Sequence, residues 1–195
     1  MANKRIDIME ATISEYVRVG ELLSTVDVAR IAGCSQSLVF RYYPDKSTLI
    51  GASFDMICSE IREVLEVIEF PEDDDGRSVS QYILKVWDAY IGYLMSNSAH
   101  ARAYLAMTSA GYKLPSRYGD PKKVVQRILR DHDVDSNSLG EDFDLLSQYI
   151  IVMSNAIAVL LADKDQKELE RIMPRIQDMV MNGLSSSLGD GVLTH

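Results

Sequence analysis

Residues that break helices are few in this chain, and they occur in clusters. They are the single residues Gly20, Gly33 and Pro44 and the runs Pro71–Gly76, Gly111–Pro121 and Asp131–Gly140. Between them apolar residues recur every three or four positions, as at Ile57, Ile61 and Leu65, which is the period of an amphipathic helix. No window alternates polar and apolar residues for long enough to indicate a strand. The pattern predicts an all-α protein.

The breakers and candidate caps place the helices along the chain. Helices are predicted over residues 4–19, 24–32, 36–42, 45–69, 78–96, 99–110, 120–131, 141–162 and 166–188. Pro174 lies inside the last of them and has no N–H for the helical ladder, so we expect a kink or a restart there. The acidic run over 71–76 lacks the spaced ligands of a calcium loop and is interpreted as a solvated connection.

The composition excludes several classes of protein. With 195 residues, of which 47% are hydrophobic and 25% charged, the chain has the make-up of a globular protein. Its longest apolar stretch, Tyr149–Ala162, is shorter than the ~20 residues that a membrane span needs. The start of the sequence has no apolar segment typical of a secretory signal, and two cysteines exclude a disulfide framework. We therefore expect a cytoplasmic protein with no membrane partner.

No arrangement of residues typical of catalysis is found in the sequence. The histidines are His100, His132 and His195, and none belongs to a His-Glu-x-x-His motif. The sequence also has no glycine-rich phosphate loop and no nucleophile elbow. We therefore predict no catalytic residues, no metal site and no cofactor, and an enzyme is the least favoured class of function.

The segment over residues 24–46 carries the clearest functional pattern. Ser24 and Asp27 have the spacing of a capping box at the start of a helix. Gly33 suits the positive φ that ends a helix, and Ser35 can cap a second one. Two short helices joined by three or four residues that include a glycine form a helix–turn–helix. The residues expected to pack these helices together are Val28, Ala29, Ala32, Val39 and Phe40.

In a helix–turn–helix the second helix enters the major groove of DNA, with its N-terminal residues toward the base edges. Here those residues are Gln36 and Ser37, with Ser35 just before them. A glutamine amide can form two hydrogen bonds with adenine, and a serine hydroxyl can bond several base edges. The three residues are therefore candidates for base contact, the alternative being ordinary exposed positions of a helix.

The charge of the chain is unevenly distributed. The net charge is −9, which by itself makes nucleic acid a poor partner. Residues 1–50, however, hold six basic and six acidic side chains, so their net charge is zero. The remaining residues carry the whole excess, with 14 basic against 23 acidic side chains. The segment with the helix–turn–helix is thus electrostatically different from the rest.

Residues 4–57 resemble the tetracycline-repressor (TetR) family of bacterial regulators. The likeness is carried by the segment 24–46 and by the first helix, where an apolar pair, alanine, an aromatic residue and a glycine follow one another between Ile8 and Gly20. Beyond residue 57 it rests on length and helical patterning alone. The resemblance implies a three-helix DNA-binding domain over 1–47 and a larger helical domain for effector binding and dimerisation over 48–195.

The resemblance also implies roles for single residues. Gln36, Ser37 and Leu38 would face the bases, and Lys46 would meet a phosphate in the first turn of the next helix. The phosphate-facing side would also hold Phe40, Arg41 and Tyr42. Tyr43, unlike Tyr42, is expected in the core.

Three features of this segment depart from the family's pattern. Ser37 stands where a glycine is common, and Phe40 stands where a tyrosine is common. Phe40 has no hydroxyl to donate to a phosphate. The connection between Gly20 and Ser24 is also about one residue shorter than usual.

In a TetR-like domain the middle helices line an effector cavity. The residues assigned to that cavity are Trp87, Tyr90, Leu94, His100, Tyr104, Met107 and Tyr112. Their helical spacing is equally typical of an ordinary core. The implied ligand is an unidentified, mostly apolar small molecule.

The last two predicted helices each carry an apolar stripe. The stripes are Tyr149, Ile150, Met153, Ala156, Ile157 and Leu160 on one helix, and Ile172, Ile176, Met179, Val180, Gly183 and Leu184 on the other. Two helices from each protomer would form a four-helix bundle, which matches the homodimer of the family. The stripes could instead be buried within their own domain.

These observations favour a homodimeric DNA-binding transcriptional regulator. Its partners would be double-stranded DNA with a pseudo-palindromic operator and a small-molecule effector that releases the protein from that operator. A repressor is favoured over an activator. The alternative is a helical ligand-binding or protein-interaction module without operator binding.

Overall fold

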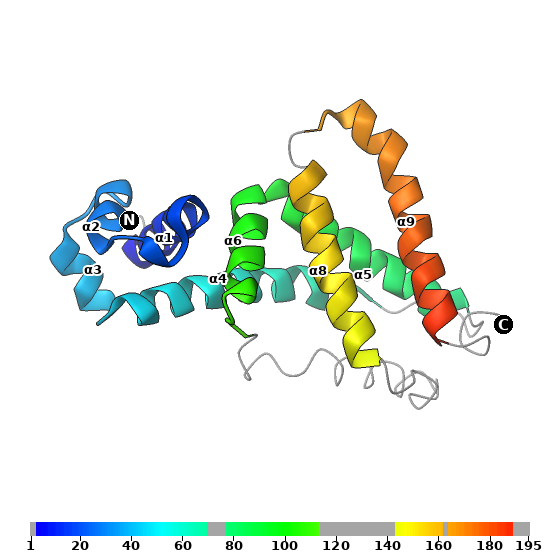
Figure 1. The fold of residues 1–195 in the computed structure, drawn as a ribbon, viewed down its shortest axis with the longest axis horizontal. Helices are drawn as coiled ribbons and strands as arrows, with labels where there is room; N and C mark the ends of the chain where they lie inside the picture. The colour runs from blue at the N-terminus through cyan, green and yellow to red at the C-terminus, as the bar shows by residue number, and fades with distance from the viewer. Residues whose placement is uncertain (1–2, 70–76, 114–142, 162–163, 189–195) are drawn as a thin grey trace. The chain divides into compact units, whose positions relative to one another are not determined.

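The structure is a computed structural model that describes residues 3–69, 77–113, 143–161 and 164–188 (Figure 1). Regular structure in these residues is helical, which confirms the prediction of an all-α protein. The elements are α1 (Lys4–Val19), the 3-10 turn η1 (Gly20–Leu22), α2 (Thr25–Ile31), α3 (Gln36–Tyr42), α4 (Lys46–Glu66), α5 (Arg77–Ser96), α6 (Ser98–Ser109), α8 (Phe143–Leu161) and α9 (Gln166–Leu188). The helix predicted over 120–131 lies outside the described residues.

Local signals in the sequence set several of these boundaries. The side chain of Asn3 caps α1 by accepting the N–H of Arg5 at 3.2 Å. Gly20 ends the same helix with a φ of 61°, a conformation that costs glycine little, and its N–H bonds the carbonyl of Tyr16. The helix α9 continues through the exposed Pro174, so the predicted restart there is wrong, and the kink stays a prediction. On the exposed side of a helix, water can bond a carbonyl that lacks a helical donor.

Packing divides the chain into two compact units. The first contains the described residues up to Ile61 together with 97–113, and the second contains 62–96 with α8 and α9. This division by packing differs from the functional division expected at residue 47, which stays a prediction.

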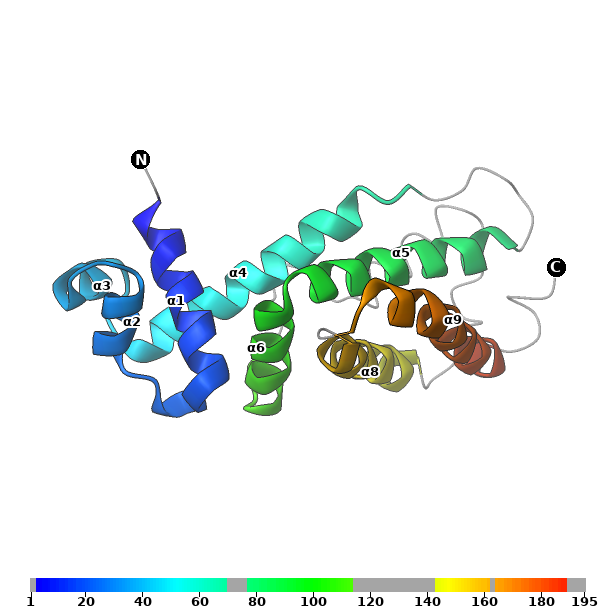
Figure 2. The same cartoon turned by 90° about the horizontal axis from the view of Figure 1, so that it is seen from above.

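In the first unit, α1 packs against α2 and α6, and α2 packs against α3 (Figure 2). Its core includes the fully buried side chains of Ile8, Ile13, Val28, Val39, Leu49, Ile50 and Ile57. The buried hydroxyl of Thr12 in this core donates to the carbonyl of Ile8 at 2.8 Å. The helix–turn–helix and the later helix α6 therefore share one hydrophobic core.

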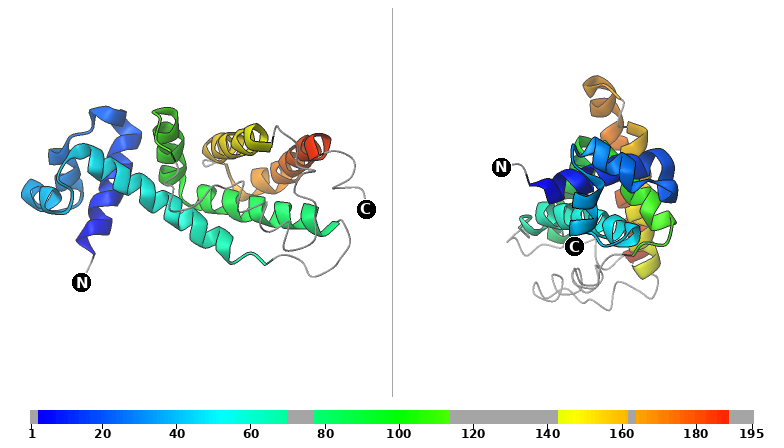
Figure 3. Two further views of the ribbon diagram at one scale, coloured as in Figure 1. Left: turned by 90° about the horizontal axis from the view of Figure 1, so that it is seen from below. Right: turned by 90° about the vertical axis from the view of Figure 1, so that its left-hand side faces the viewer.

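In the second unit, α5 packs against α8 and α9, which also pack against each other (Figure 3). Trp87, Ile91 and Leu94 of α5 are buried here, as are Ala158 and Leu161 of α8. On a more exposed edge the amide of Gln177 in α9 donates to the carboxylate of Asp88 in α5 at 2.6 Å. Within the described parts of the chain, no helix is both long and apolar enough to cross a membrane.

Candidate nucleic-acid interface

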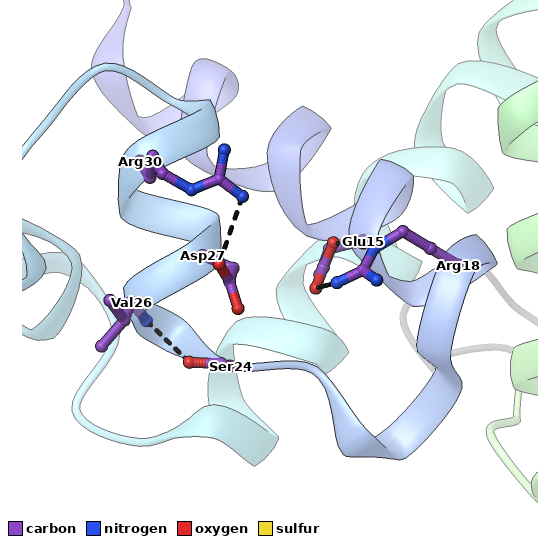
Figure 4. A network of polar contacts seen from close by, with 6 residues as sticks. All are labelled: Glu15, Arg18, Ser24, Val26, Asp27 and Arg30. Carbon is purple, nitrogen blue, oxygen red and sulfur yellow. Dashed lines mark hydrogen bonds and ion pairs between the residues drawn. The ribbon is translucent and has the colours of Figure 1, made fainter.

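The predicted helix–turn–helix is formed by α2 and α3. The hydroxyl of Ser24 caps α2 by accepting the N–H of Val26 at 3.2 Å, whereas the carboxylate of Asp27 is directed at Arg30 (Figure 4). The capping residue is thus confirmed, and Asp27 forms an ion pair instead of the second half of a capping box. Gly33 has a φ of 62°, and Ser35 caps α3 by accepting the N–H of Leu38 at 3.2 Å.

The two helices are held together by small and branched apolar side chains. Val28 and Val39 are fully buried, and Ala29 and Ala32 are nearly so, as predicted. Phe40 is 44% exposed, so its predicted packing role is wrong. It follows Val39 directly, and neighbouring positions of a helix do not share a face.

The two tyrosines at the end of α3 have different environments. Tyr43 is 2% exposed and Tyr42 is 39% exposed, which confirms Tyr43 as the core residue. The hydroxyl of Tyr43 donates to the carbonyl of Arg5 at 3.5 Å, and the guanidinium of Arg5 lies 5.8 Å from the centre of the ring. Tyr43 therefore anchors the end of α3 to the start of α1.

Polar side chains occupy the start of α3 and are exposed. Ser35, Gln36 and Ser37 are all exposed, and Leu38 is half-buried. The hydroxyls of Ser35 and Ser37 are 2.9 Å apart. The amide Nε2 of Gln36 donates to the hydroxyl of Thr25, the first residue of α2, at 2.8 Å. The side chains predicted to face bases thus lie together on one exposed end of the motif.

Exposed cations of the first unit differ in the partners that they bond. Arg18 and Arg30 form ion pairs with Glu15 and Asp27 within their own helices (Figure 4). Lys46 begins α4, as expected, and its Nζ donates to the carbonyl of Glu21 at 2.7 Å, which leaves two N–H groups of the ammonium for other acceptors.

Arg41 is an exposed cation in the last turn of α3. Among the residues that the structure describes, no ion pair or hydrogen bond engages its guanidinium. The nearby Asp45 accepts the N–H of Thr48 at 2.7 Å, a bond that lowers the pKa of Asp45 and directs its carboxylate to the start of α4. Arg41 therefore keeps its hydrogen-bond donors for another partner.

Comparison with known sequences gives no family. No family model matches the chain, and no curated protein matches it.

Several solved structures have a similar fold. A TetR family transcription regulator from Marinobacter aquaeolei VT8 is 18% identical to this chain, with a TM-score of 0.67 over 92% of this chain and 94% of that one. A TetR-like transcriptional regulator from Rhodococcus sp. RHA1 is 15% identical, with a TM-score of 0.64 over 100% and 98% of the two chains. The fatty acid degradation regulator FadR from Bacillus halodurans is 12% identical, with a TM-score of 0.61 over 93% and 96%. The chain has the fold of the TetR family regulators.

The TetR-like fold places four of the predicted effector residues in the first unit. The buried His100 lies between two carboxylates, with Nε2 3.0 Å from Glu10 and Nδ1 3.2 Å from Glu60. The remaining three are Tyr104, Met107 and Tyr112. His100 thus connects α6 to α1 and to α4.

The rings of Tyr104 and Tyr112 pack on Phe54 of α4, with centroids 5.5 Å and 5.9 Å away. Burial raises the pKa of Tyr104 to about 12. The pKa of Tyr112 is raised first by burial and then by the carboxylate of Glu21. These contacts make the two tyrosines part of the packing between α4 and α6.

The other three predicted effector residues, Trp87, Tyr90 and Leu94, are buried in the second unit of the TetR-like fold. The indole Nε1 of Trp87 donates to the hydroxyl of Ser154 at 3.0 Å, and the amide of Asn155 donates to the hydroxyl of Tyr90 at 2.6 Å. Sequence reasoning missed Ser154 and Asn155 as partners of these aromatic residues. Their signal was the polar pair inside the apolar run Tyr149–Ala162.

The last two helices expose part of their predicted stripes. Met153 and Leu160 of α8 are 39% and 74% exposed, and Met179 of α9 is 74% exposed. The half-buried members are Ala156, Ile157, Ile172, Ile176 and Val180. The side chains of Tyr149, Ile150, Gly183 and Leu184 lie outside the description. Each stripe therefore combines packed and accessible apolar residues.

Proposed function

We propose that this chain is a DNA-binding transcriptional regulator of the TetR type, a homodimeric repressor that a small-molecule effector releases from its operator. One observation carries the proposal. The second helix of a capped helix–turn–helix exposes Gln36 and Ser37 at its start, with Arg41 and Lys46 nearby. This combination suits a helix that enters the major groove while flanking cations hold the phosphates.

The proposed contacts divide into two kinds. Ser35, Gln36, Ser37 and Leu38 would face base edges and carry sequence information. Phosphate contacts would come from Arg41, Tyr42 and Lys46, with Phe40 packed against the sugar–phosphate backbone. Because residues 1–50 have no net charge, each of these cations contributes a large share of the attraction to DNA.

The proposed dimer would form through α8 and α9. These helices pack against each other and expose Leu160 and Met179, each 74% accessible, with Met153 also exposed. Soluble monomers seldom leave large apolar patches open to water. A second copy related by a two-fold axis would cover these side chains and present two copies of α3 to a pseudo-palindromic site.

The proposed effector would bind in the second unit, beside the predicted cavity residues Trp87, Tyr90 and Leu94. Within the second unit it would meet the Trp87 indole and the Tyr90 hydroxyl, and it would compete with their bonds to Ser154 and Asn155. Because one structural neighbour is a fatty acid degradation regulator, a fatty acid is a suitable first probe. Effector and DNA affinities must be linked reciprocally if the ligand causes release.

The test compares Gln36→Ala and Lys46→Ala on specific and scrambled duplexes across a salt series, using DNA from upstream of the protein's own gene. Gln36→Ala should relax the preference at one position of each half-site, at a cost of roughly 1–3 kcal/mol per contact. Lys46→Ala should weaken both duplexes and reduce the salt slope by about 0.9 per lost phosphate contact.

Lys164→Ala is the matched control, because Lys164 is an exposed lysine paired with Glu168 in the second unit. It should change neither the preference nor the slope. If the wild-type protein binds both duplexes equally weakly, the alternative of a helical ligand-binding or interaction module is correct instead.

A further inference from the structure

The start of α3 is connected to α2 by a hydrogen bond between two side chains. Nε2 of Gln36 donates to Oγ1 of Thr25 at 2.8 Å, across a separation of eleven positions in the sequence. Thr25 is half-buried and is the first residue of α2, and Gln36 is exposed and is the first residue of α3. The bond therefore joins the long, exposed side chain of Gln36 to a half-buried residue of the neighbouring helix.

We propose that Thr25 is a positioning residue that orients the amide of Gln36 for reading a base. The proposal rests on the proposed function, in which Gln36 faces a base edge. A glutamine amide has two N–H groups and one carbonyl oxygen. When one N–H bonds Thr25, the other N–H and Oε1 remain for a base, which is the pair of groups that adenine requires at N7 and N6.

The other polar side chains at this end do not share that dependence on α2. The hydroxyl of Ser35 accepts the N–H of Leu38 and lies 2.9 Å from the hydroxyl of Ser37. The two serines are thus held within α3 itself. Gln36 has more rotatable bonds than either serine, so fixing its side chain costs more conformational entropy. Because the bond to Thr25 fixes the side chain before DNA binds, that entropy is not lost again on binding.

The test is a double-mutant cycle in the full chain with Thr25→Val and Gln36→Ala. Thr25→Val removes the hydroxyl while keeping the shape, and Thr25→Ser, which keeps a hydroxyl, is the matched control. The probes are operator duplexes that carry each of the four bases at the position where Gln36→Ala loses discrimination. Thr25→Val should reduce the preference at that position by roughly threefold to tenfold, part of what a whole bidentate contact gives.

Three results of the cycle are decisive. Thr25→Ser should keep the wild-type preference, and Thr25→Val should have no further effect when Gln36 is already alanine. If Thr25→Val weakens operator and random duplexes equally, Thr25 is a phosphate contact and the positioning role is wrong. If it leaves the base preference unchanged while Gln36→Ala relaxes it, the positioning role is wrong and the proposed function stands.

A second readout needs no DNA. The side-chain amide of Gln36 gives two proton resonances in a nuclear magnetic resonance spectrum. Thr25→Val should move them toward the values of a freely rotating glutamine, and Thr25→Ser should not. Because Ser24, not Thr25, caps α2, circular dichroism should show the same helix content in all three proteins. If the wild-type amide is already freely rotating, the positioning role is wrong. If wild type prefers no duplex, the proposed function fails separately.

Discussion

Replacing His100 by alanine should destabilise the first unit. Its side chain is 8% exposed, and both ring nitrogens lie within 3.2 Å of a carboxylate oxygen. His100→Ala removes both contacts, which connect α6 to α1 and α4.

The size of the effect follows from the burial of the partners. A hydrogen bond to a charged group contributes about 1.5–3 kcal/mol when it is buried. The side chains of Glu10 and Glu60 are 46% and 36% exposed. Because water can bond these carboxylates once the ring is gone, the loss is smaller than for a buried pair, about 1 kcal/mol for each contact. Loss of packing around the truncated ring adds about 1 kcal/mol. The expected loss is about 3 kcal/mol, which is a large part of the stability of a typical domain.

The assay is amide hydrogen exchange followed residue by residue, because the chain has two compact units and a single unfolding transition is not assured. Slowly exchanging amides of α1 and α6 should lose roughly a hundredfold in protection, the equivalent of about 3 kcal/mol. Ser109→Ala is the control on the same helix, since Ser109 is exposed and its hydroxyl, among the residues that the structure describes, bonds the carbonyl of Leu105 alone. If His100→Ala and Ser109→Ala change protection equally little, the His100 contacts do not stabilise this unit.

Three further predictions follow from single residues. Gly33→Ala should lower the free energy of unfolding by about 1 kcal/mol, because a residue with a side chain is strained at a φ of 62° even though the added Cβ meets nothing within 4 Å. An unchanged thermal unfolding curve would contradict this. Tyr104, with its pKa raised to about 12, favours the folded state below pH 10, and that contribution is lost as the pH rises from 10 to about 12. Tyr104→Phe should therefore unfold less steeply than wild type in an alkaline titration followed by circular dichroism; equal curves would refute the assignment. Leu160→Lys should lower the mass found by sedimentation at micromolar concentration, whereas Val67→Lys, equally exposed but outside α8 and α9, should not.

Local signals in the sequence predicted the helix–turn–helix closely. Ser24, Gly33 and Ser35 act through hydrogen bonds and backbone angles within a few residues, so their roles can be read from neighbours in the sequence. The burial of Tyr43 and the exposure of Tyr42 were also predictable, because the resemblance to the TetR family implied that Tyr43 stands at a position that packs in the core. Phe40 was expected to pack between the two helices, but it follows the buried Val39 and lies on a different face of α3, where it is exposed.

Contacts between distant segments were not predictable from spacing. His100 is 90 positions from Glu10, and Trp87 is 67 positions from Ser154. Helical period tells which residues share a face, but not which face of another helix they meet. For the same reason the sequence did not indicate that α6 packs against α1. The bond between Thr25 and Gln36 depends on the angle between two helices, which no local pattern specifies.

The central claim is that two copies of α3 read DNA as a symmetric pair. The most direct test is selection of bound sequences from a pool of random duplexes, using the full wild-type chain. We expect enrichment of a pseudo-palindromic motif whose half-sites lie one helical turn apart, or a multiple of it, on the same face of DNA. Gln36→Ala should relax one symmetric pair of positions in that motif. Enrichment of no motif, or of a motif without two-fold symmetry, would contradict the account.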